Sequence, residues 1–489
     1  MHNLFRHRAT LALLALACVS ATTRAQSAPR VITLQQAIEM AERQGLPAIA
    51  ALSTRQAARA RDNSFFARRM PQVTLGIVAP SYDRSILPIV QPDGSTSFTP
   101  LQRTDASVGM TLSQPLPFTG GLLSVTSSIE RLRYSGANSS QTWTSNPITV
   151  RLSQGLFRPN ALKWDRREED LRLDFAERQF LEAREDIAIF AANAFFDLYA
   201  AKTGLANAVV NVAVNDTLYT LNKGRYEVGK IGENDLLQSE LALLRARSSL
   251  DGAKLEYDRS LSALRLAINV PNGTPLAIIV PSTIPTFDPD TARAVSEALK
   301  NRSQLADYSL QEVQARRHIN DARLNNGLGA TVEASMGFNS TAPEFNTAYN
   351  NLLQAQRFAL GVSVPLVQWG VRGAEVQAAQ ADQRRVEALT RSGREQSAQD
   401  AKYAALQLSQ AQRNVSLSAK ADTVGTKRFE VAYNRYVIGK IGIDNLYLAQ
   451  SEKDQALLQY VAALRGYWAA YYRLRRLTLY DFELNSQIR

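Results

Sequence analysis

Cysteine and histidine are nearly absent from this chain of 489 residues. Cys18 is the single cysteine, and His318 is the one histidine outside the first seven residues. A chain with so little cysteine has no disulfide framework, so its stability must come from packing. No Ser-His-Asp grouping, metal-ligand spacing or Gly-rich phosphate loop is present, and an isolated histidine lacks the partners that acid-base catalysis needs. The sequence therefore predicts no enzyme activity, no metal site and no other cofactor.

A long apolar run occurs only at the N-terminus. Basic Arg6 and Arg8 precede the apolar residues 9–21, and the segment Thr23-Arg24-Ala25 follows. This order is typical of a secretory signal peptide, and we expect residues 1–25 to be removed after Ala25. The rest of the chain has no run of about 18 apolar residues and predicts no transmembrane helix. Strands of a transmembrane β-barrel remain compatible with this part of the chain, because they show only a weak alternation of apolar and polar residues.

Cys18 gives the N-terminal segment a second interpretation. It follows Ala15-Leu16-Ala17, which resembles a lipoprotein box with Ala in place of the usual Leu. A lipid anchor at Cys18 is therefore the alternative to cleavage after Ala25. Both interpretations send the body of the chain out of the cytoplasm.

The chain has only a small excess of positive charge, spread over its length. The formal net charge is +11, and removal of residues 1–25, which carry three arginines and no acid, leaves +8. Over so long a chain this is a weak basic bias, and an exported protein meets little nucleic acid. We therefore expect no nucleic-acid partner, and we expect solvated surfaces that contact anionic lipid of the outer membrane.

One short phrase occurs twice, 210 residues apart. It begins at Arg225 and again at Arg435, and each copy lies between two long helical patterns. Glycines supply the backbone conformation of a tight reversal, so each copy is predicted to be the tip that joins two helices. Tyr257 and Tyr467 keep the same spacing, which indicates a tandem duplication. The predicted tip residues are Gly229, Lys230, Ile231 and Gly232 in the first copy, and Gly439, Lys440, Ile441 and Gly442 in the second.

Apolar residues at three- and four-residue spacing predict helices on both sides of each tip. The first pair is expected at residues 160–222 and 234–268, and the second at residues 374–432 and 444–479. The first helix would span on the order of 95 Å, which no globular core requires, so coiled packing between neighbouring helices is expected. We also expect four aromatic residues to pack between helices: Tyr467, Trp468, Tyr471 and Tyr472.

A shorter helix precedes the strands of each half. Helical spacing over residues 34–69, broken at Gly45-Leu46-Pro47, changes after Pro71 to alternation with period two, and a helix over residues 294–325 is followed by the same change. A return strand then leads into the long helix of each half. The alternating apolar residues are Val73, Leu75 and Ile77 with Ile148, Val150 and Leu152 in the first half, and Ala330, Val332, Ala334, Met336 and Phe338 with Phe358, Leu360, Val362 and Val364 in the second.

The interval between the outgoing strand and the return strand is longer in the first half than in the second. The outgoing strands are 257 residues apart, 47 more than the tips. The added interval contains alternating runs at residues 108–112 and 123–129 around a Pro/Gly-rich turn at residues 115–121. We expect an added β-hairpin, which gives six strands instead of four, with exposed loops at residues 88–100 and 135–147.

These features predict the organisation of the chain. A signal peptide is followed by two structural repeats, a Pro/Gly-rich connector between the repeats, and a short tail. The predicted bounds are residues 1–25 for the signal peptide, 26–270 for the first repeat, 271–290 for the connector, 291–480 for the second repeat and 481–489 for the tail.

In this order the features resemble the TolC-like outer-membrane efflux protein family. The resemblance covers residues 34–480, with two tandem halves, strand ends at residues 153–156 and 363–366 that lead into long helices, and a Tyr-x-x-Gly tip in each half. It implies an α+β membrane protein in the outer membrane that extends into the periplasm. The implied assembly is a homotrimer that shares one transmembrane β-barrel and one periplasmic α-helical tunnel. The added hairpin departs from the family's two strands per half.

The resemblance also implies a function and partners. It implies an exit duct of a tripartite efflux or type I secretion system, with a periplasmic adaptor (membrane fusion) protein and an inner-membrane transporter as partners. In such systems the pump and the adaptor select the substrate. A periplasmic coiled-coil adaptor or scaffold without a channel is the alternative function; it would account for the helices and tips but not for strands at equivalent points of both halves.

A gate at the tips is a further implication of the resemblance. In the family, carboxylates and a Tyr-Arg-Asp hydrogen-bond set close the tunnel, and the tips receive the adaptor. Ile441, beside Lys440, stands at the arginine position, and Asn445, beside Asp444, replaces the second aspartate. The implied gate residues are Asp235, Tyr436, Asp444 and Asn445, and we expect Asp444 or Asn445 to accept a hydrogen bond from Tyr436.

Structural roles alone are the alternative for these residues. A turn would explain the tip glycines without adaptor docking, although it leaves the repeated Lys-Ile between them unexplained. A carboxylate that favours a helix N-terminus would explain Asp235 without a gate.

Overall fold

The computed structural model describes residues 30–135, 139–281 and 283–488. The predicted signal peptide and Cys18 lie outside the described residues. The described chain divides into two compact units. Among the described residues, no helix is both long enough and apolar enough to cross a membrane.

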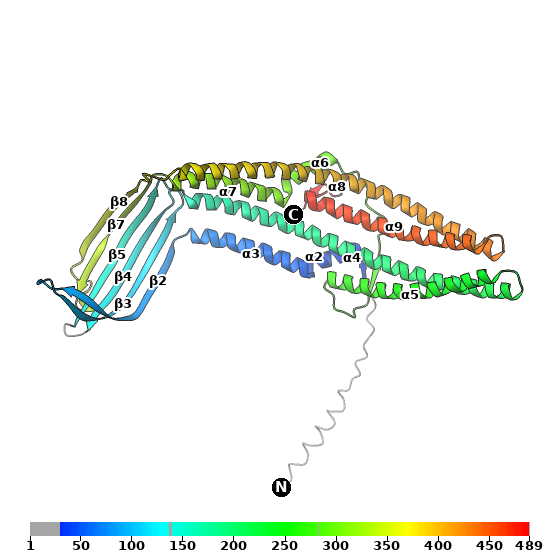
Figure 1. Cartoon of the computed structure of the whole chain (residues 1–489), viewed down its shortest axis with the longest axis horizontal. Coiled ribbons are helices and arrows are strands. Elements are labelled where there is room, and N and C mark those ends of the chain that lie inside the picture. Colours follow the sequence, from blue (N-terminus) through cyan, green and yellow to red (C-terminus); the bar gives the residue numbers. More distant parts are fainter. Residues whose placement is uncertain (1–29, 136–138, 282, 489) are drawn as a thin grey trace, which may run out of the picture. The chain divides into compact units, whose positions relative to one another are not determined.

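The first unit contains the described residues up to Ile49, residues 186–288 and residues 407–473. Two helical hairpins meet the prediction of paired helices on either side of each tip (Figure 1). The hairpins consist of α4 (Ala161–Glu227) with α5 (Glu233–Ala267), and α8 (Val371–Val437) with α9 (Ile443–Thr478). Five apolar residues of α4 that recur at three- and four-residue spacing are buried: Ile187, Ala191, Ala194, Phe195 and Leu198.

A small parallel sheet in this unit was not predicted. Strand β1 (Arg30–Thr33) pairs with β6 (Leu276–Ile279), which lies in the predicted connector. Thr33 then begins α2 (Leu34–Gln44) with a reciprocal capping box to Gln36. Helix α3 (Leu46–Arg68) follows the break at Gly45, where the sequence predicted one.

The predicted aromatic cluster packs, but not only between helices. Tyr471 meets Phe287 of the connector edge to face at 6.1 Å, and the hydroxyl of Tyr467 donates to the backbone oxygen of Pro285 at 2.7 Å. Trp468 lies edge-on to Tyr467 at 5.3 Å and stacks on Tyr472. The cluster therefore fixes the connector to α9 in addition to filling space along the helix.

The second unit contains residues 50–185, 289–406 and the described residues from Leu474 onward, with a six-stranded antiparallel sheet as its largest feature (Figure 1). The added hairpin and the total of six strands were predicted correctly. Both predicted loops are shorter than expected, because residues 88–90, 96–100 and 140–147 continue the ladder of hydrogen bonds. The strands, in sheet order, are β2 (Gln72–Val90), β3 (Thr96–Leu116), β4 (Gly121–Ser135), β5 (Ser140–Leu156), β7 (Gly329–Ala342) and β8 (Leu353–Ser363).

One face of this sheet is apolar across all six strands. The registers place Leu75 opposite Met110, and Val125 of β4 opposite Leu112 and Val150. Directly opposed residues share a face of an antiparallel pair. The large apolar residues on this face that are exposed include Val73, Leu75 and Ile77 of β2, Val108, Met110 and Leu112 of β3, Ile148 of β5, Met336 and Phe338 of β7, and Phe358, Leu360 and Val362 of β8. Val364 lies beyond β8, which corrects its predicted place in the return strand.

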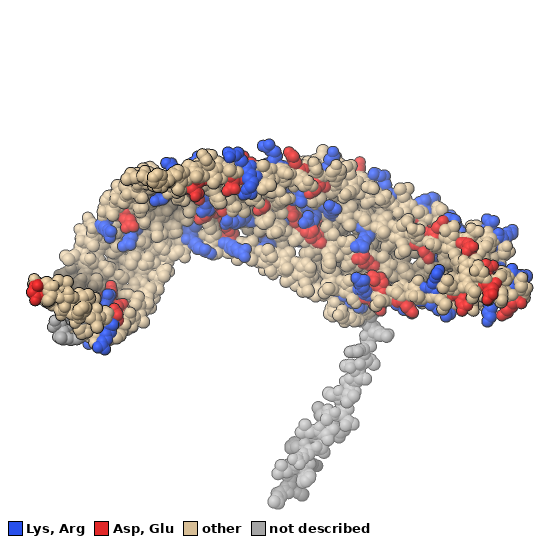
Figure 2. Space-filling model, in the orientation of Figure 1, with Lys and Arg blue, Asp and Glu red and all other residues tan. Residues whose placement is uncertain are grey.

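The opposite face is lined mainly by small and polar residues. The row Ser113, Ser124, Arg151, Ser335 and Arg357 runs across five strands, and the next row is equally free of large apolar side chains. Figure 2 shows a largely uncharged surface over the sheet, with a group of charged side chains at the strand ends away from the helices. The sheet thus has two chemically different faces.

The helix predicted over residues 294–325 is two helices, α6 (Thr291–Asn301) and α7 (Ser303–Asn325). The break at Arg302 is held by long-range hydrogen bonds: the Ser303 N–H donates to Glu182 at 2.7 Å, and Arg302 donates to Asp400 at 3.3 Å. Apolar spacing does not encode these partners, which explains the wrong prediction of a continuous helix.

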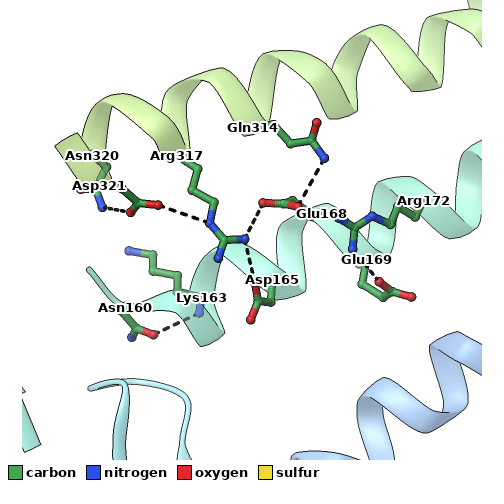
Figure 3. A network of polar contacts seen from close by, with 10 residues as sticks. All are labelled: Asn160, Lys163, Asp165, Glu168, Glu169, Arg172, Gln314, Arg317, Asn320 and Asp321. Carbon is green, nitrogen blue, oxygen red and sulfur yellow. Dashed lines mark hydrogen bonds and ion pairs between the residues drawn. The ribbon is translucent and has the colours of Figure 1, made fainter. Parts of the chain in front are cut away.

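A charged network joins α7 to α4 within this unit (Figure 3). Arg317 of α7 donates to Asp165 and to the buried Glu168 of α4, both at 2.7 Å. Asp321 lies one turn along α7, 3.6 Å from the Arg317 guanidinium, and Arg172 binds the second oxygen of Glu168 at 2.8 Å. Hydrogen bonding to Glu168 raises the pKa of Arg317, which therefore carries a permanent charge.

Candidate functional site

The two tips have the same backbone geometry. Gly229 and Gly439 have φ angles of 70° and 74°, in the left-handed region that glycine adopts without strain. The N–H of Gly229 donates to Tyr226 O and that of Lys230 to Arg225 O, both at 2.8 Å. The equivalent bonds of the second tip are both 2.9 Å. This is the Schellman arrangement that ends a helix, so the repeated phrase encodes a helix stop.

The second glycine of each tip has a different role. Gly232 is the N-cap of α5 with φ −79°, and its carbonyl accepts from the N–H groups of Asp235 and Leu236. A side chain added at Gly232 or Gly442 would meet open space. Lys230 and Lys440, between the glycines, are exposed at the ends of the hairpins.

Tyr436 joins the two hairpins. Its side chain is buried, and its hydroxyl donates to the side-chain oxygen of Asn222 in α4 at 2.6 Å. The Arg225 guanidinium lies 5.2 Å from the centroid of the Tyr436 ring and donates to the backbone oxygen of Val437 at 3.0 Å. Arg225 thus combines a cation–π contact with the capping of α8, whose last carbonyls lack helical partners. The apolar side chains packed around this contact are Leu218, Ile443 and Leu446.

The expected partner of Tyr436 was wrong. Asp444 and Asn445, which were expected to accept its hydrogen bond, are exposed in the first turn of α9. Asp444 instead accepts from Gln238 of α5 at 2.7 Å. Asp235 lies half-buried in the first turn of α5, and among the described residues its carboxylate has no hydrogen-bond or ion-pair partner.

A groove of about 730 Å³ lies near the tips between α4, α5 and α9. Its lining includes Asn211 and Asn215, whose side-chain oxygens are buried without a hydrogen-bond partner among the described residues. The Asn211 amide donates to Asp454 of α9 at 2.8 Å. Tyr447 also lines the groove, and burial, together with the nearby Tyr436, raises the pKa of Tyr447 to about 12. The contact between the hairpins is therefore partly polar rather than a uniformly apolar seam.

The sequence prediction missed three residues that hold the tips together: Asn222, Arg225 and Gln238. One signal was available, because Leu218, Asn222 and Arg225 follow the four- and three-residue spacing of one helix face. A buried asparagine on such a face requires a partner. The partner itself, 214 positions away, could not be found from local spacing.

Comparison with known proteins supports the predicted resemblance. Residues 101–270 match the family model described as outer membrane efflux protein. This segment of the chain is therefore similar to outer membrane efflux proteins. A curated relative, Protein CyaE of Bordetella pertussis, is 23% identical over 339 residues, which are 68% of this chain and 70% of CyaE.

Solved structures share the fold of this chain. The CmeC outer membrane channel of Campylobacter jejuni aligns with a TM-score of 0.66 at 15% identity, covering 93% of this chain and 86% of CmeC. The outer membrane protein VceC of Vibrio cholerae aligns with a TM-score of 0.64 at 14% identity, covering 93% of this chain and 97% of VceC. The predicted resemblance to outer-membrane efflux proteins is confirmed over residues 101–270, and the solved structures confirm the fold.

The comparisons also bear on the predicted functional classes. The family model that matches residues 101–270 and the solved structures with this fold describe outer-membrane proteins and channels rather than enzymes. The alternative of a periplasmic coiled-coil scaffold does not explain a six-stranded sheet with one exposed apolar face.

Proposed function

We propose that three copies of this chain form one outer-membrane exit channel, with the apolar face of each sheet toward lipid. The observation that carries the proposal is the sheet itself. Among the described strands, β2 pairs only with β3 and β8 only with β7, so both edges of the sheet are open. Backbone groups in lipid must be paired, and an open apolar sheet requires further strands to close it. Edge pairing between β8 of one copy and β2 of the next supplies them.

Three six-stranded sheets would give an eighteen-stranded barrel. Barrels of roughly 16–18 strands leave an aqueous channel. The polar face, with its Ser, Thr and Gly residues, then lines the water-filled lumen, and the apolar face contacts the hydrocarbon of the membrane.

The helical hairpins form the periplasmic tunnel in this proposal, and their tips form its inner entrance. Asp235, Asp444 and Asn445 lie in the first turns of α5 and α9, next to the tips, where three copies bring like charges together. The Tyr436–Asn222 hydrogen bond and the Arg225 cap hold the two hairpins of one chain together near the entrance. A periplasmic adaptor opens the entrance by offering alternative contacts to Lys230, Ile231, Lys440 and Ile441, and an inner-membrane transporter supplies the substrate of an efflux or type I secretion system.

Membrane fractionation followed by chemical cross-linking tests the assembly. The protein should fractionate with the outer membrane and migrate after mild cross-linking at three times the mass of one chain. A soluble periplasmic monomer after detergent-free lysis would contradict the proposal.

Planar-bilayer recording tests the entrance. Asp235→Ala should lower the preference for cations, because it removes the carboxylate that we place at the constriction. Lys254→Ala, farther along α5 and paired with Asp251 on the surface, serves as the control that leaves selectivity unchanged. If Asp235→Ala conducts with the parent's selectivity, the constriction lies elsewhere.

A further inference from the structure

Near the loop end of the sheet, three arginines lie on the face opposite to the one that carries the acidic side chains. Arg131 and Arg133 of β4 are two and four residues past Ile129, so they share its apolar face. Arg84 of β2 pairs with Gln102 of β3, which lies on that same face, since β3 and β4 pair without a register shift. These three residues, Arg84, Arg131 and Arg133, are called the outer basic row.

The acids of this region lie on the other face. Asp105 pairs with Ser81 and Leu132, and Glu130 pairs with Ser107, all at positions that alternate with the apolar ones. Arg103 of β3 shares their face and lies 3.5 Å from Asp105. The polar face thus has charges of both signs, whereas the outer basic row has arginine alone.

The outer basic row is not neutralised within the chain. No hydrogen bond or ion pair joins Arg84, Arg131 or Arg133 to another side chain in the described part of the protein. Arg131 instead lies 5.9 Å from the ring centroid of Trp143, its direct neighbour on β5. Trp143 meets Phe345 edge to face at 5.2 Å, which adds an aromatic cluster beside the arginines. Aromatic residues of this kind are enriched where a membrane protein crosses from hydrocarbon to headgroups.

We propose that the outer basic row binds the phosphate groups of lipid headgroups in the outer leaflet of the outer membrane. The inference rests on the proposed function, which turns the apolar face toward lipid and the strand ends away from the helices toward the cell exterior. Along β4, the backbone position of Arg131 lies about 7 Å beyond that of Ile129, since each strand residue advances roughly 3.4 Å. This places the guanidinium groups at headgroup height, with their stems against the apolar band.

Arginine suits this ligand. Its planar fork donates two parallel hydrogen bonds to phosphate oxygens, and Arg131 and Arg133 are about 7 Å apart on one face, since alternate residues of a strand are separated by that distance. A lipid with two phosphates on its headgroup can therefore bind both side chains. Among the described strand residues of this region, no acid lies on this face, so its charge there is positive only and complements the negative charge of phosphate.

Native mass spectrometry of the purified trimer with diphosphoryl lipid A tests the proposal. The variant R131Q/R133Q should bind this lipid about tenfold more weakly, because it loses charge-assisted hydrogen bonds. R103Q removes one arginine charge from the opposite face of the same sheet and should bind within about twofold of the parent. Lipid A stripped of both phosphates should bind parent and variants alike.

Three outcomes would overturn the inference. They are unchanged lipid binding by R131Q/R133Q, an equal loss in R103Q, and displacement of lipid A by millimolar inorganic phosphate with equal binding of that ion, which would indicate a soluble phosphate site. If R131Q/R133Q does not assemble, R133Q alone, at an exposed side chain, is measured by the same criterion. A parent protein that forms no trimer would contradict the proposed function instead, so the two failures are distinguishable.

Discussion

The hydroxyl of Tyr436 donates a hydrogen bond to Asn222 across 2.6 Å, although 214 positions separate the two residues in the sequence. The bond connects α8 to α4 where both helices approach their tips. Both side chains are buried, Asn222 completely. The two halves of the duplicated sequence are therefore joined near the tips by one polar contact inside a small apolar cluster.

Removal of this contact should loosen the tips. Tyr436→Phe leaves the oxygen of Asn222 buried and unpaired, which costs about 1–3 kcal/mol. Hydrogen exchange over residues 433–447 should therefore become faster, and resting conductance in a bilayer should rise.

Tyr447→Phe is the matched control. The Tyr447 hydroxyl is buried without a hydrogen-bond partner among the described residues, so its removal should be neutral or stabilising. Equal acceleration of exchange in both variants would show that ring packing, and not the Tyr436 hydrogen bond, holds the tips.

The glycines of each tip should respond differently to alanine. Gly229→Ala and Gly439→Ala force a left-handed conformation on a residue with a Cβ, which costs roughly 1–2 kcal/mol. Gly232→Ala and Gly442→Ala should be nearly neutral, because their added methyl groups meet open space. Chemical denaturation of the detergent-solubilised protein measures the difference, and equal effects at all four positions would contradict the assigned helix stops.

The Arg317 network should stabilise the second unit. Arg317→Ala leaves Glu168, which is 4% exposed, with less compensation for its buried charge. Loss of one partner of a buried pair costs about 3–5 kcal/mol, and the remaining bond from Arg172 should reduce this effect. Arg385→Ala removes an exposed pair with Asp382 and should cost less than about 1 kcal/mol. Similar thermal unfolding of both variants would show that the network contributes no more than a surface pair.

Glu177 should make the contact between α3 and α4 sensitive to acid. Burial opposes ionisation of Glu177, but hydrogen bonds from Arg59 and Arg55 outweigh it and hold the pKa below its ordinary value of 4.5. A lowered pKa contributes stability that is present above the ordinary value and is lost as the pH falls through the lowered one. The parent should therefore be more stable than Arg55→Gln/Arg59→Gln at pH 7, and the difference should shrink below about pH 4.5.

Arg61→Gln is the control for this experiment, because Arg61 is an exposed residue of the same helix. It should match the parent at every pH. A gap between the parent and the double variant that stays constant down to pH 3 would exclude Glu177 as its source.

Local patterns in the sequence were sufficient for much of the fold. Period-two alternation found all six strands of the sheet, because one face is apolar at every step, and the repeated phrase found both helix stops. Contacts between distant segments were beyond such patterns. The pairing of β1 with β6, the break at Arg302 and the acceptor of Tyr436 each depend on a partner more than 90 positions away, which no local spacing specifies.

The candidate site was predicted less completely than the fold. Gly229 and Gly439 act as expected because backbone conformation is a local property. The family resemblance offered Asp444 or Asn445 as the acceptor of Tyr436, but Asp444 accepts a hydrogen bond from Gln238. The gate and docking roles of the tip residues stay predictions.

Site-directed labelling of the added hairpin tests the central claim most directly. Cys18 is the single native cysteine and lies in the predicted signal peptide, so one introduced cysteine would be the unique label of the processed protein. Val108→Cys and Met110→Cys should react with a lipid-soluble maleimide in outer membranes, whereas Gly109→Cys and Thr111→Cys should react with a water-soluble one that enters the lumen. Uniform reaction of all four positions with the water-soluble reagent would contradict the account, because it would place the apolar face of the sheet in water rather than in lipid.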